Sequence, residues 1–401
     1  MGHTGPVIAR PGPRQRRRAR TDGLPRPAWV LAGIAFTVAI GFGVVAPAIP
    51  VFAREFGVGR AAAGAVVSAF AFMRLASALL GGRLADRLGE RRVLSAGVGI
   101  VAVSSGLAGL AGSYVQLLVL RGLGGVGSAM FTVSAIGLLL RVVGPDQRAR
   151  AMGLWQGGFL LGGIAGPALG GLLTAWSLRA PFFVYAVVSG IAGLIGLAAL
   201  PRAAGGGRSG EGADGEGPRM RIRDAWRHSG YRAALVTNVG TGWNLFGVRN
   251  SLVPLFVAEA LLASSAWTGI GFFVSAATQG LLLAPAGRFA DRVGRRPAMM
   301  TGSLVAAVGI GLLAVLETLP GYLTAMGVFG AGAAFLSVAP SAAVGDVVRG
   351  RGGAVVATFQ MAGDFGAVLG PIIAGMIVDG ASYRAAFAVS AVVLAAGFVA
   401  S

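Results

Sequence analysis

The sequence contains no cysteine, which excludes disulfide bonds and thiolate metal sites. Charge is also scarce, since 12% of the 401 residues are charged against about 25% in soluble domains. With 55% hydrophobic residues, the remaining polar surface is too small to cover a water-soluble globule. Histidine is limited to His3 and His228, both in polar segments. We therefore expect no metal, no cofactor and no catalytic centre.

Twelve apolar runs have the length that a bilayer-spanning helix needs, about 20 residues. They lie near 28–51, 61–81, 93–112, 114–140, 151–175, 180–200, 232–257, 265–286, 298–317, 320–343, 354–378 and 383–400. A soluble bundle would need amphipathic helices facing water, and these are missing. The first run is too long for a signal peptide and has no A-x-A cleavage site after it. The pattern predicts an all-α integral membrane protein in contact with the lipid bilayer.

Every one of the 34 basic residues is an arginine, and their placement predicts the orientation of the helices. With the N-terminus inside, 27 of the 34 fall in the tail or in inside loops. The others are Arg54, Arg60, Arg179 and Arg384 in outside loops and Arg74, Arg121 and Arg249 within spans. Cytoplasmic loops carry such an excess, which explains the net charge of +19 better than nucleic-acid binding. We expect a monomer in the cell (inner) membrane, with both termini cytoplasmic and no nucleic-acid partner.

The two halves of the sequence repeat each other at an offset of 204 to 205 residues. GRLADRLGERR (82–92) matches GRFADRVGRRP (287–297) at seven of eleven positions, and three further segments align at the same offset. A Gly-rich polar stretch at 203–218 marks a flexible linker between the halves. We predict a basic cytoplasmic tail (1–27), a six-helix domain (28–200), a cytoplasmic linker (201–231) and a second six-helix domain (232–401). Such repeats are typical of transporters with a site between the halves.

The repeated segment, between spans two and three and again between spans eight and nine, resembles the signature of the major facilitator superfamily. The resemblance implies twelve transmembrane helices in two pseudo-symmetric six-helix bundles (the major facilitator fold), around a cavity that opens alternately to each side. In that family the signature acts as a conformational latch. The latch residues here are Gly82, Arg83, Asp86, Arg87, Gly89, Arg91, Arg92, Gly287, Arg288, Asp291, Arg292, Gly294 and Arg295. Glu90 replaces the usual arginine, which we expect to weaken or rearrange the latch; the alternative is that the arginines only anchor the loops inside.

Two further segments resemble signatures of the same superfamily. Span five carries Gly153, Gly162, Gly166, Pro167, Gly170 and Gly171, a spacing that resembles the antiporter signature of proton-driven exporters. The alternative is ordinary close packing of a glycine-lined helix face. In span four, Arg121 before Gly125 and Gly127 resembles a signature whose arginine is tied to proton transfer. Together they imply export by proton antiport.

Charged residues within spans are the places where the repeat breaks. Arg121 corresponds to Met326, Asp364 to Leu160, Arg74 to Gln279 and Arg249, less securely, to Val45. A charge at mid-membrane costs at least about 2.5–3.5 kcal/mol and indicates function. Asp364 is our first candidate for the proton carrier, and Arg74, Arg121 and Arg249 are candidates for coupling. The alternatives are a static salt bridge from Asp364 to Arg121 or Arg249, and snorkelling of Arg74 and Arg249 to the interface.

The polar and aromatic groups that we expect to line the cavity are Gln156, Gln279, Gln360, Asn238, Asn244 and Trp243. We predict a secondary active transporter that exports drug-like compounds or metabolites, with a small-molecule substrate and protons as its partners. A nutrient symporter or facilitator on the same fold is the first alternative. A membrane receptor or enzyme is a more distant one.

Overall fold

A computed structural model describes residues 23–144, 147–201, 222–348 and 353–400, and within these ranges the regular structure is helical with no strand. This confirms the all-α prediction. Most of the predicted tail and the Gly-rich segment 203–218 lie outside the described residues.

The described part of the first half contains seven helices. They are α2 (Arg26–Val45), α3 (Ala48–Arg54), α4 (Arg60–Leu88), α5 (Glu90–Gly109), α6 (Tyr114–Val142), α7 (Arg148–Trp176) and α8 (Ala180–Ala199). The second half, as described, contains α9 (Ile222–Trp226), α10 (Ser229–Thr241), η2 (Gly242–Val248), α11 (Arg249–Leu255), η3 (Phe256–Ala260), α12 (Ser265–Arg292), α13 (Arg295–Val315), α14 (Leu319–Val347), α15 (Gly353–Gly380) and α16 (Tyr383–Ala400).

Ten helices in the described part of the chain are long and apolar enough to cross a membrane, with α2 and α3 counted as one. The last predicted span is the shorter apolar helix Tyr383–Val399. The seventh, from Ser229 to Ala260, is one helical rod interrupted by the π-helical turns η2 and η3, which the sequence did not predict. π-Helical turns are frequent at functional sites.

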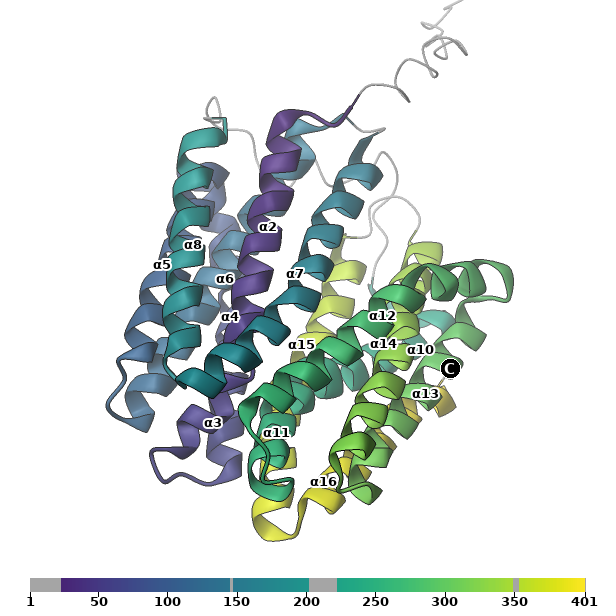
Figure 1. Cartoon of the computed structure of the whole chain (residues 1–401). Helices are drawn as coiled ribbons and strands as arrows, with labels where there is room; N and C mark the ends of the chain where they lie inside the picture. The colour runs from purple at the N-terminus through teal and green to yellow at the C-terminus, as the bar shows by residue number, and fades with distance from the viewer. Residues whose placement is uncertain (1–22, 145–146, 202–221, 349–352, 401) are drawn as a thin grey trace, which may run out of the picture.

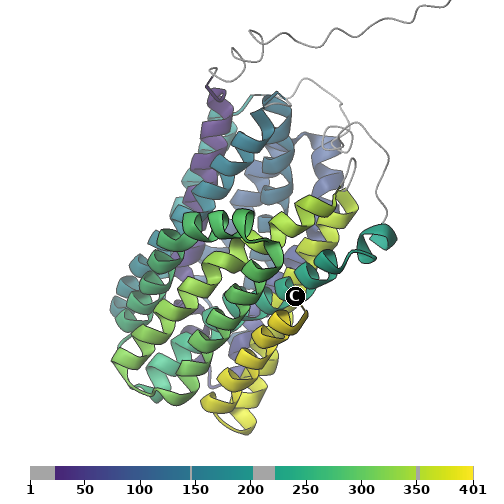
Figure 2. The same cartoon turned by 90° about the vertical axis from the view of Figure 1, so that its right-hand side faces the viewer.

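The two halves lie side by side, with the purple-to-teal helices next to the green-to-yellow ones in Figure 1, and Figure 2 shows the second half in front. Within the first half α2 packs on α7 and α8, and α6 on α4 and α5; in the second half α14 packs on α12 and α13. The halves meet where α4 packs on α15 and α7 on α12. Helices α6 and α14 show the repeat directly, since they have the same length at an offset of 205 residues.

The two ends of the bundle need names. We call the end at which α2 begins, and at which α4 and α6 finish, the tail end. The far end holds α3, α11 and the start of α16, at the bottom of Figure 1, together with the turns at 55–59, 261–264 and 316–318.

Candidate functional site

Helices α4 and α15 join the halves along a row of polar contacts that starts at the far end. The Arg60 and Ala61 amides each donate to the Asp379 carboxylate at 2.9 Å. Deeper along the same two helices, the Ser68 hydroxyl donates to the Val368 carbonyl at 2.6 Å.

The row ends at an ion pair between Arg74 and Asp364, which lies about 21 Å along α4 from Arg60. Asp364 therefore pairs with Arg74, and the salt bridge to Arg121 or Arg249, given above as the alternative, is not the one that forms. Arg74 does not snorkel away from the interior, because its guanidinium is held by this carboxylate. The side chains are 40% and 22% exposed, so the pair remains accessible to water and to a ligand.

Glu259, at the far end of η3, ties both halves together. Its carboxylate accepts from Arg54 Nε at 2.9 Å and from Arg60 Nε at 2.8 Å, both in the first half. The Tyr383 hydroxyl of α16 donates to the same carboxylate at 2.7 Å. This cluster was not among the sites predicted from the sequence. The signal for it is the presence of two arginines on the arginine-poor side of the membrane together with an acid at the end of a span.

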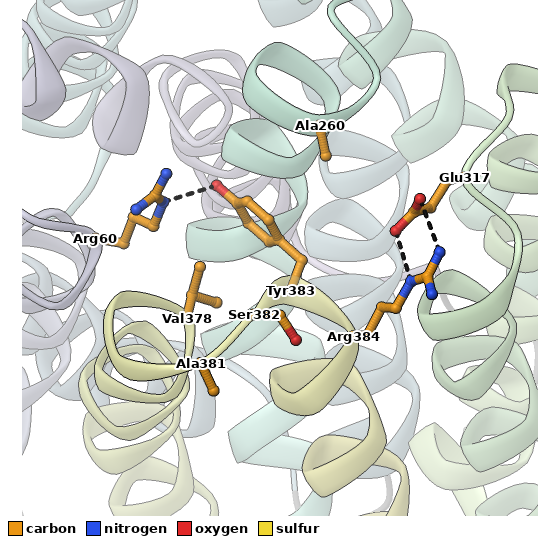
Figure 3. Close-up of a pocket in the computed structure, with 8 residues that line it drawn as sticks. All are labelled: Arg60, Ala260, Glu317, Val378, Ala381, Ser382, Tyr383 and Arg384. Atoms are coloured by element: carbon orange, nitrogen blue, oxygen red, sulfur yellow. Dashed lines mark hydrogen bonds and ion pairs between the residues drawn. The ribbon is translucent and has the colours of Figure 1, made fainter.

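A shallow pocket of about 350 Å³ opens beside this cluster at the far end, and Figure 3 shows Arg60 bonded to Tyr383 on one side of it. On the other side Arg384 makes two hydrogen bonds to Glu317, at 2.8 and 3.0 Å. These bonds hold the pKa of the Glu317 carboxyl below its usual value. The pocket is thus bounded by paired charges.

The other contact between the halves, α7 on α12, is built from glycine. A Cβ atom at Gly171 would overlap the backbone of Gly269, and one at Gly269 would lie 3.0 Å from the Pro167 carbonyl oxygen. Helix α2 also packs along α7, since a Cβ at Gly162, Gly166 or Gly170 of α7 would overlap backbone carbonyls of α2. Gly153 has open space around it. These contacts describe close packing; the link of the motif to export stays a prediction.

Arg121 and Arg249 are held inside their own halves. Arg121 is 2% exposed, and its guanidinium lies 4.7 Å from the Phe70 ring centroid. Arg249 lies 5.0 Å from the Phe272 ring centroid, so it packs inside the second half rather than snorkelling to an interface. Both have a buried Nε atom without a hydrogen-bond partner.

The cavity candidates fall into two groups. Trp243 and Asn244 are buried and bond to Ser390 of α16 at 3.2 Å, Gln279 donates to Ser337 at 2.8 Å and Asn238 to the Phe359 carbonyl at 2.7 Å. Their side-chain N–H groups thus donate within the second half, while the Asn244 Oδ1 atom is buried without a partner. Gln156 and Gln360 are exposed, and Gln360 lies one turn before Asp364, so these two keep their amides available.

The two copies of the latch carry the same ion pair with opposite polarity. In the second half Arg295, at the start of α13, bonds Asp291 and, at 3.0 Å, Asp346 near the end of α14. In the first half Glu90, at the start of α5, pairs with Arg141 near the end of α6. Glu90 corresponds to Arg295 and Arg141 to Asp346 at the repeat offset of 205. The departure at Glu90 is therefore matched by its partner, and the tie between the two helices is kept.

The remaining latch residues shape or flank these turns. Gly89 and Gly294 have φ values of 85° and 124°, which side chains disfavour. Arg91 donates to the Leu197 carbonyl. The exposed members are Arg83, Asp86, Arg87, Arg92, Arg288, Asp291 and Arg292, and Gly82 and Gly287 are partly buried helix positions.

Comparisons with known proteins agree on the family. The family model described as Major Facilitator Superfamily matches residues 31–249 and 235–401. Quinolone resistance protein NorA of Staphylococcus aureus (strain MRSA252) is 30% identical over 148 residues, 37% of this chain and 38% of that protein. Multidrug resistance protein 2 of Bacillus subtilis (strain 168) is 29% identical over 41% of each chain. The matches thus span about two fifths of the length of these relatives.

Solved structures share the fold at low sequence identity. A single-residue mutant of the nucleoside transporter NupG superposes with a TM-score of 0.74 at 18% identity, covering 94% of this chain and 99% of that one. A bacterial homologue of the human lysosomal transporter Spinster, inward-facing and unoccupied, gives 0.74 at 17% identity, covering 94% and 97%. With family models matching nearly all of the sequence after residue 30, this chain belongs to the major facilitator superfamily of transporters.

Proposed function

We propose that this transporter exports drug-like compounds or metabolites in exchange for protons, by alternating access. The observation that carries the proposal is the ion pair between Arg74 and Asp364, which joins the two halves at the deepest point of the α4–α15 row. The relatives named for quinolone and multidrug resistance support export and the class of cargo.

The orientation follows from the arginines. Cytoplasmic loops attract Lys and Arg, and 27 of the 34 arginines fall, by sequence, in the N-terminal tail, the linker or the loops predicted to lie on the same side. We therefore assign the tail end to the cytoplasm of a cell membrane, with both termini inside. The contacts between the halves run from the far end to the level of Arg74, so we assign this structure to an inward-facing state that is closed to the outside.

Exchange requires that the transporter keeps its conformation when it carries neither substrate nor proton. Binding of either one must allow the conformational change. In our mechanism the ionised Asp364 holds Arg74 and keeps α4 against α15. A proton arriving at the carboxylate removes its charge and weakens the pair, and a bound substrate achieves the same by competing for one of the two partners. Residues 28–200 and 232–401 then rock as two domains, and the substrate and the proton move in opposite directions.

A transport assay in inverted membrane vesicles tests both direction and coupling. We expect uptake of the quinolone norfloxacin when the vesicle interior is acidified, because export from the cell corresponds to uptake here. Collapsing the proton gradient should remove this uptake. A symporter on the same fold would instead take the substrate up when the outside of the vesicle is acid. Uptake that ignores the gradient in either direction, by folded protein, would contradict proton coupling.

A further inference from the structure

The charged side chains deep within the described spans do not balance. They comprise three arginines, Arg74, Arg121 and Arg249, and the carboxylate of Asp364. Arg74 is neutralised by Asp364. Among the residues that the structure describes, neither Arg121 nor Arg249 forms an ion pair. Two positive charges are therefore left without a counter-charge in the interior.

Arg121 is the more deeply buried of the two. It lies on α6 about 10 Å from the far end of that helix, and its side chain faces the Phe70 ring of α4 at 4.7 Å from the centroid. The side chain that interacts with it electrostatically is Tyr185, which carries a hydroxyl group and not a carboxylate. Phe70 sits between Ser68 and Arg74, two of the α4 residues that contact α15. The cation thus packs on the helix that borders the other half.

Arg249 repeats this arrangement in the second half. Its guanidinium faces Phe272 of α12 at 5.0 Å from the centroid, and its electrostatic neighbour is Tyr322. Phe272 lies one turn after Gly269, which touches α7 of the first half. The repeat does not explain the likeness, because Arg121 corresponds to Met326 and Arg249 to Val45. Each half has acquired its buried cation at a different position.

An uncompensated charge in an apolar interior is costly unless something pairs with it. Stacking on one aromatic ring contributes only about 0.5–2 kcal/mol. In surroundings of low polarity the field of such a charge extends to a ligand nearby. A cationic ligand between the halves would be repelled by the fields of the two buried arginines and would find the carboxylate of Asp364 already paired with Arg74. An anion would supply the missing counter-charge.

We propose that the transported substrate is an organic anion, such as an aromatic carboxylate, selected by the positive charges of Arg121 and Arg249. This inference rests on the proposed transport function and narrows its substrate class. Because Arg121 lies in the first half and Arg249 in the second, both halves attract the anion, which is bound best when it lies between them.

Binding of three compounds with one ring system and different charges tests the proposal. They are 2-naphthoate, its neutral methyl ester and the cation 2-naphthylmethylammonium, titrated calorimetrically into the purified full-length protein. We expect the carboxylate to bind at least about tenfold more tightly than the other two, the size of one charge-assisted interaction. Arg121→Gln and Arg249→Gln should each remove most of this preference. Arg121→Lys and Arg249→Lys keep the charge and should retain it. Arg223→Gln, which removes an exposed arginine of the short helix α9, should leave it unchanged.

Equal or weaker binding of the carboxylate by the wild-type protein would overturn the proposal without any variant. So would a preference that survives both glutamine substitutions. If a glutamine variant does not fold, the wild-type ranking and the lysine variants still decide. Proton-driven transport of the ester or the amine without a preference for the acid would leave the exchange function standing and reject only this inference. Selective binding of the acid without proton-driven transport would do the reverse.

Discussion

The two contacts between the halves are built on the same backbone crossing but differ in charge. In the α4–α15 contact, Gly64 meets Pro371 and Gly375 meets the Arg60 carbonyl. In the α7–α12 contact, Gly269 meets Pro167 and Gly171 meets the Ser265 carbonyl. The residues correspond in four pairs at the repeat offset: Gly64 to Gly269, Arg60 to Ser265, Pro371 to Pro167 and Gly375 to Gly171. The close approach is therefore a shared inheritance of both contacts.

Of these two helix contacts, only α4–α15 carries ion pairs in the part of the chain that the structure describes; the pairs of Glu259 with Arg54 and Arg60 lie beside it at the far end. Arg60 pairs with Asp379 and Arg74 with Asp364 between α4 and α15. The equivalent positions between α7 and α12 are Ser265, Ala175, Gln279 and Leu160. The α7–α12 contact thus has the glycine crossing without these charges, and the charged row is an addition to one side. We take this as the reason to place proton coupling at α4–α15 and to treat α7–α12 as the passive contact.

The largest effect should come from removing the Asp364 carboxylate of the charged contact. Asp364→Asn leaves an amide that neither ionises nor pairs fully with Arg74, so we expect proton-driven uptake in inverted vesicles to fall to background. Substrate exchange without a gradient should persist. Leu160→Asn, at the equivalent position of the passive contact, serves as the control and should keep coupling. Coupling that survives in Asp364→Asn would remove this carboxylate from the mechanism.

Bulky side chains at the crossing should break both contacts alike. Gly375→Leu and Gly171→Leu each place a branched side chain where backbones touch, and overpacking of this kind costs about 1–3 kcal/mol. We expect transport to fall at least about tenfold in both. Gly153→Leu is the matched control, because nothing lies within 4 Å of a Cβ there, and its rate should stay near that of the wild type. A loss at one crossing and none at the other would show that the contacts are not equivalent.

The latch offers a second comparison between the halves, since its ion pair has reversed polarity. Glu90→Arg would place two arginines together at the end of α6. We expect the free energy of unfolding to fall by roughly 1–3 kcal/mol, because Glu90 is buried and Arg141 would lose this partner. Adding Arg141→Glu should restore most of the loss by recreating the polarity of Arg295 and Asp346. A double variant no more stable than Glu90→Arg would mean that the pair does not act as a unit.

The smallest effect should come from the far-end cluster. Glu259→Gln removes the carboxylate that bonds Arg54, Arg60 and Tyr383, but these groups are partly exposed, and such pairs contribute about 0.2–1 kcal/mol each. We expect a shift of roughly two- to fivefold toward the state open at the far end, measured as labelling of a cysteine introduced at Ala61. Glu317→Gln, which disturbs a pair within the second half, should not change the labelling rate. Equal labelling in all three proteins would exclude a gating role for Glu259.

The features that could be predicted from the sequence are those encoded within a single helix or within one copy of the repeat. The twelve apolar runs, the latch turns at Gly89 and Gly294 and the glycine face around Gly166 are all local patterns. The pair of Arg74 with Asp364 was not predictable in the same way, because it depends on which helix of one half faces which helix of the other. The π-helical turns near Trp243 also depend on the neighbouring helix. The reversed pair of Glu90 and Arg141 was within reach, since aligning α6 with α14 places Arg141 opposite Asp346.

The central claim is that protonation of Asp364 opens the charged contact. Pulsed electron–electron double resonance measures the distance between two spin labels. One sample would carry labels at the far ends of α4 and α15, a second at the far ends of α7 and α12, and both would be measured across a pH series. We predict that the α4–α15 distance lengthens as the pH falls, and that Asp364→Asn shows the long distance at every pH. An α4–α15 distance that does not respond to pH, or that still responds in Asp364→Asn, would contradict the claim.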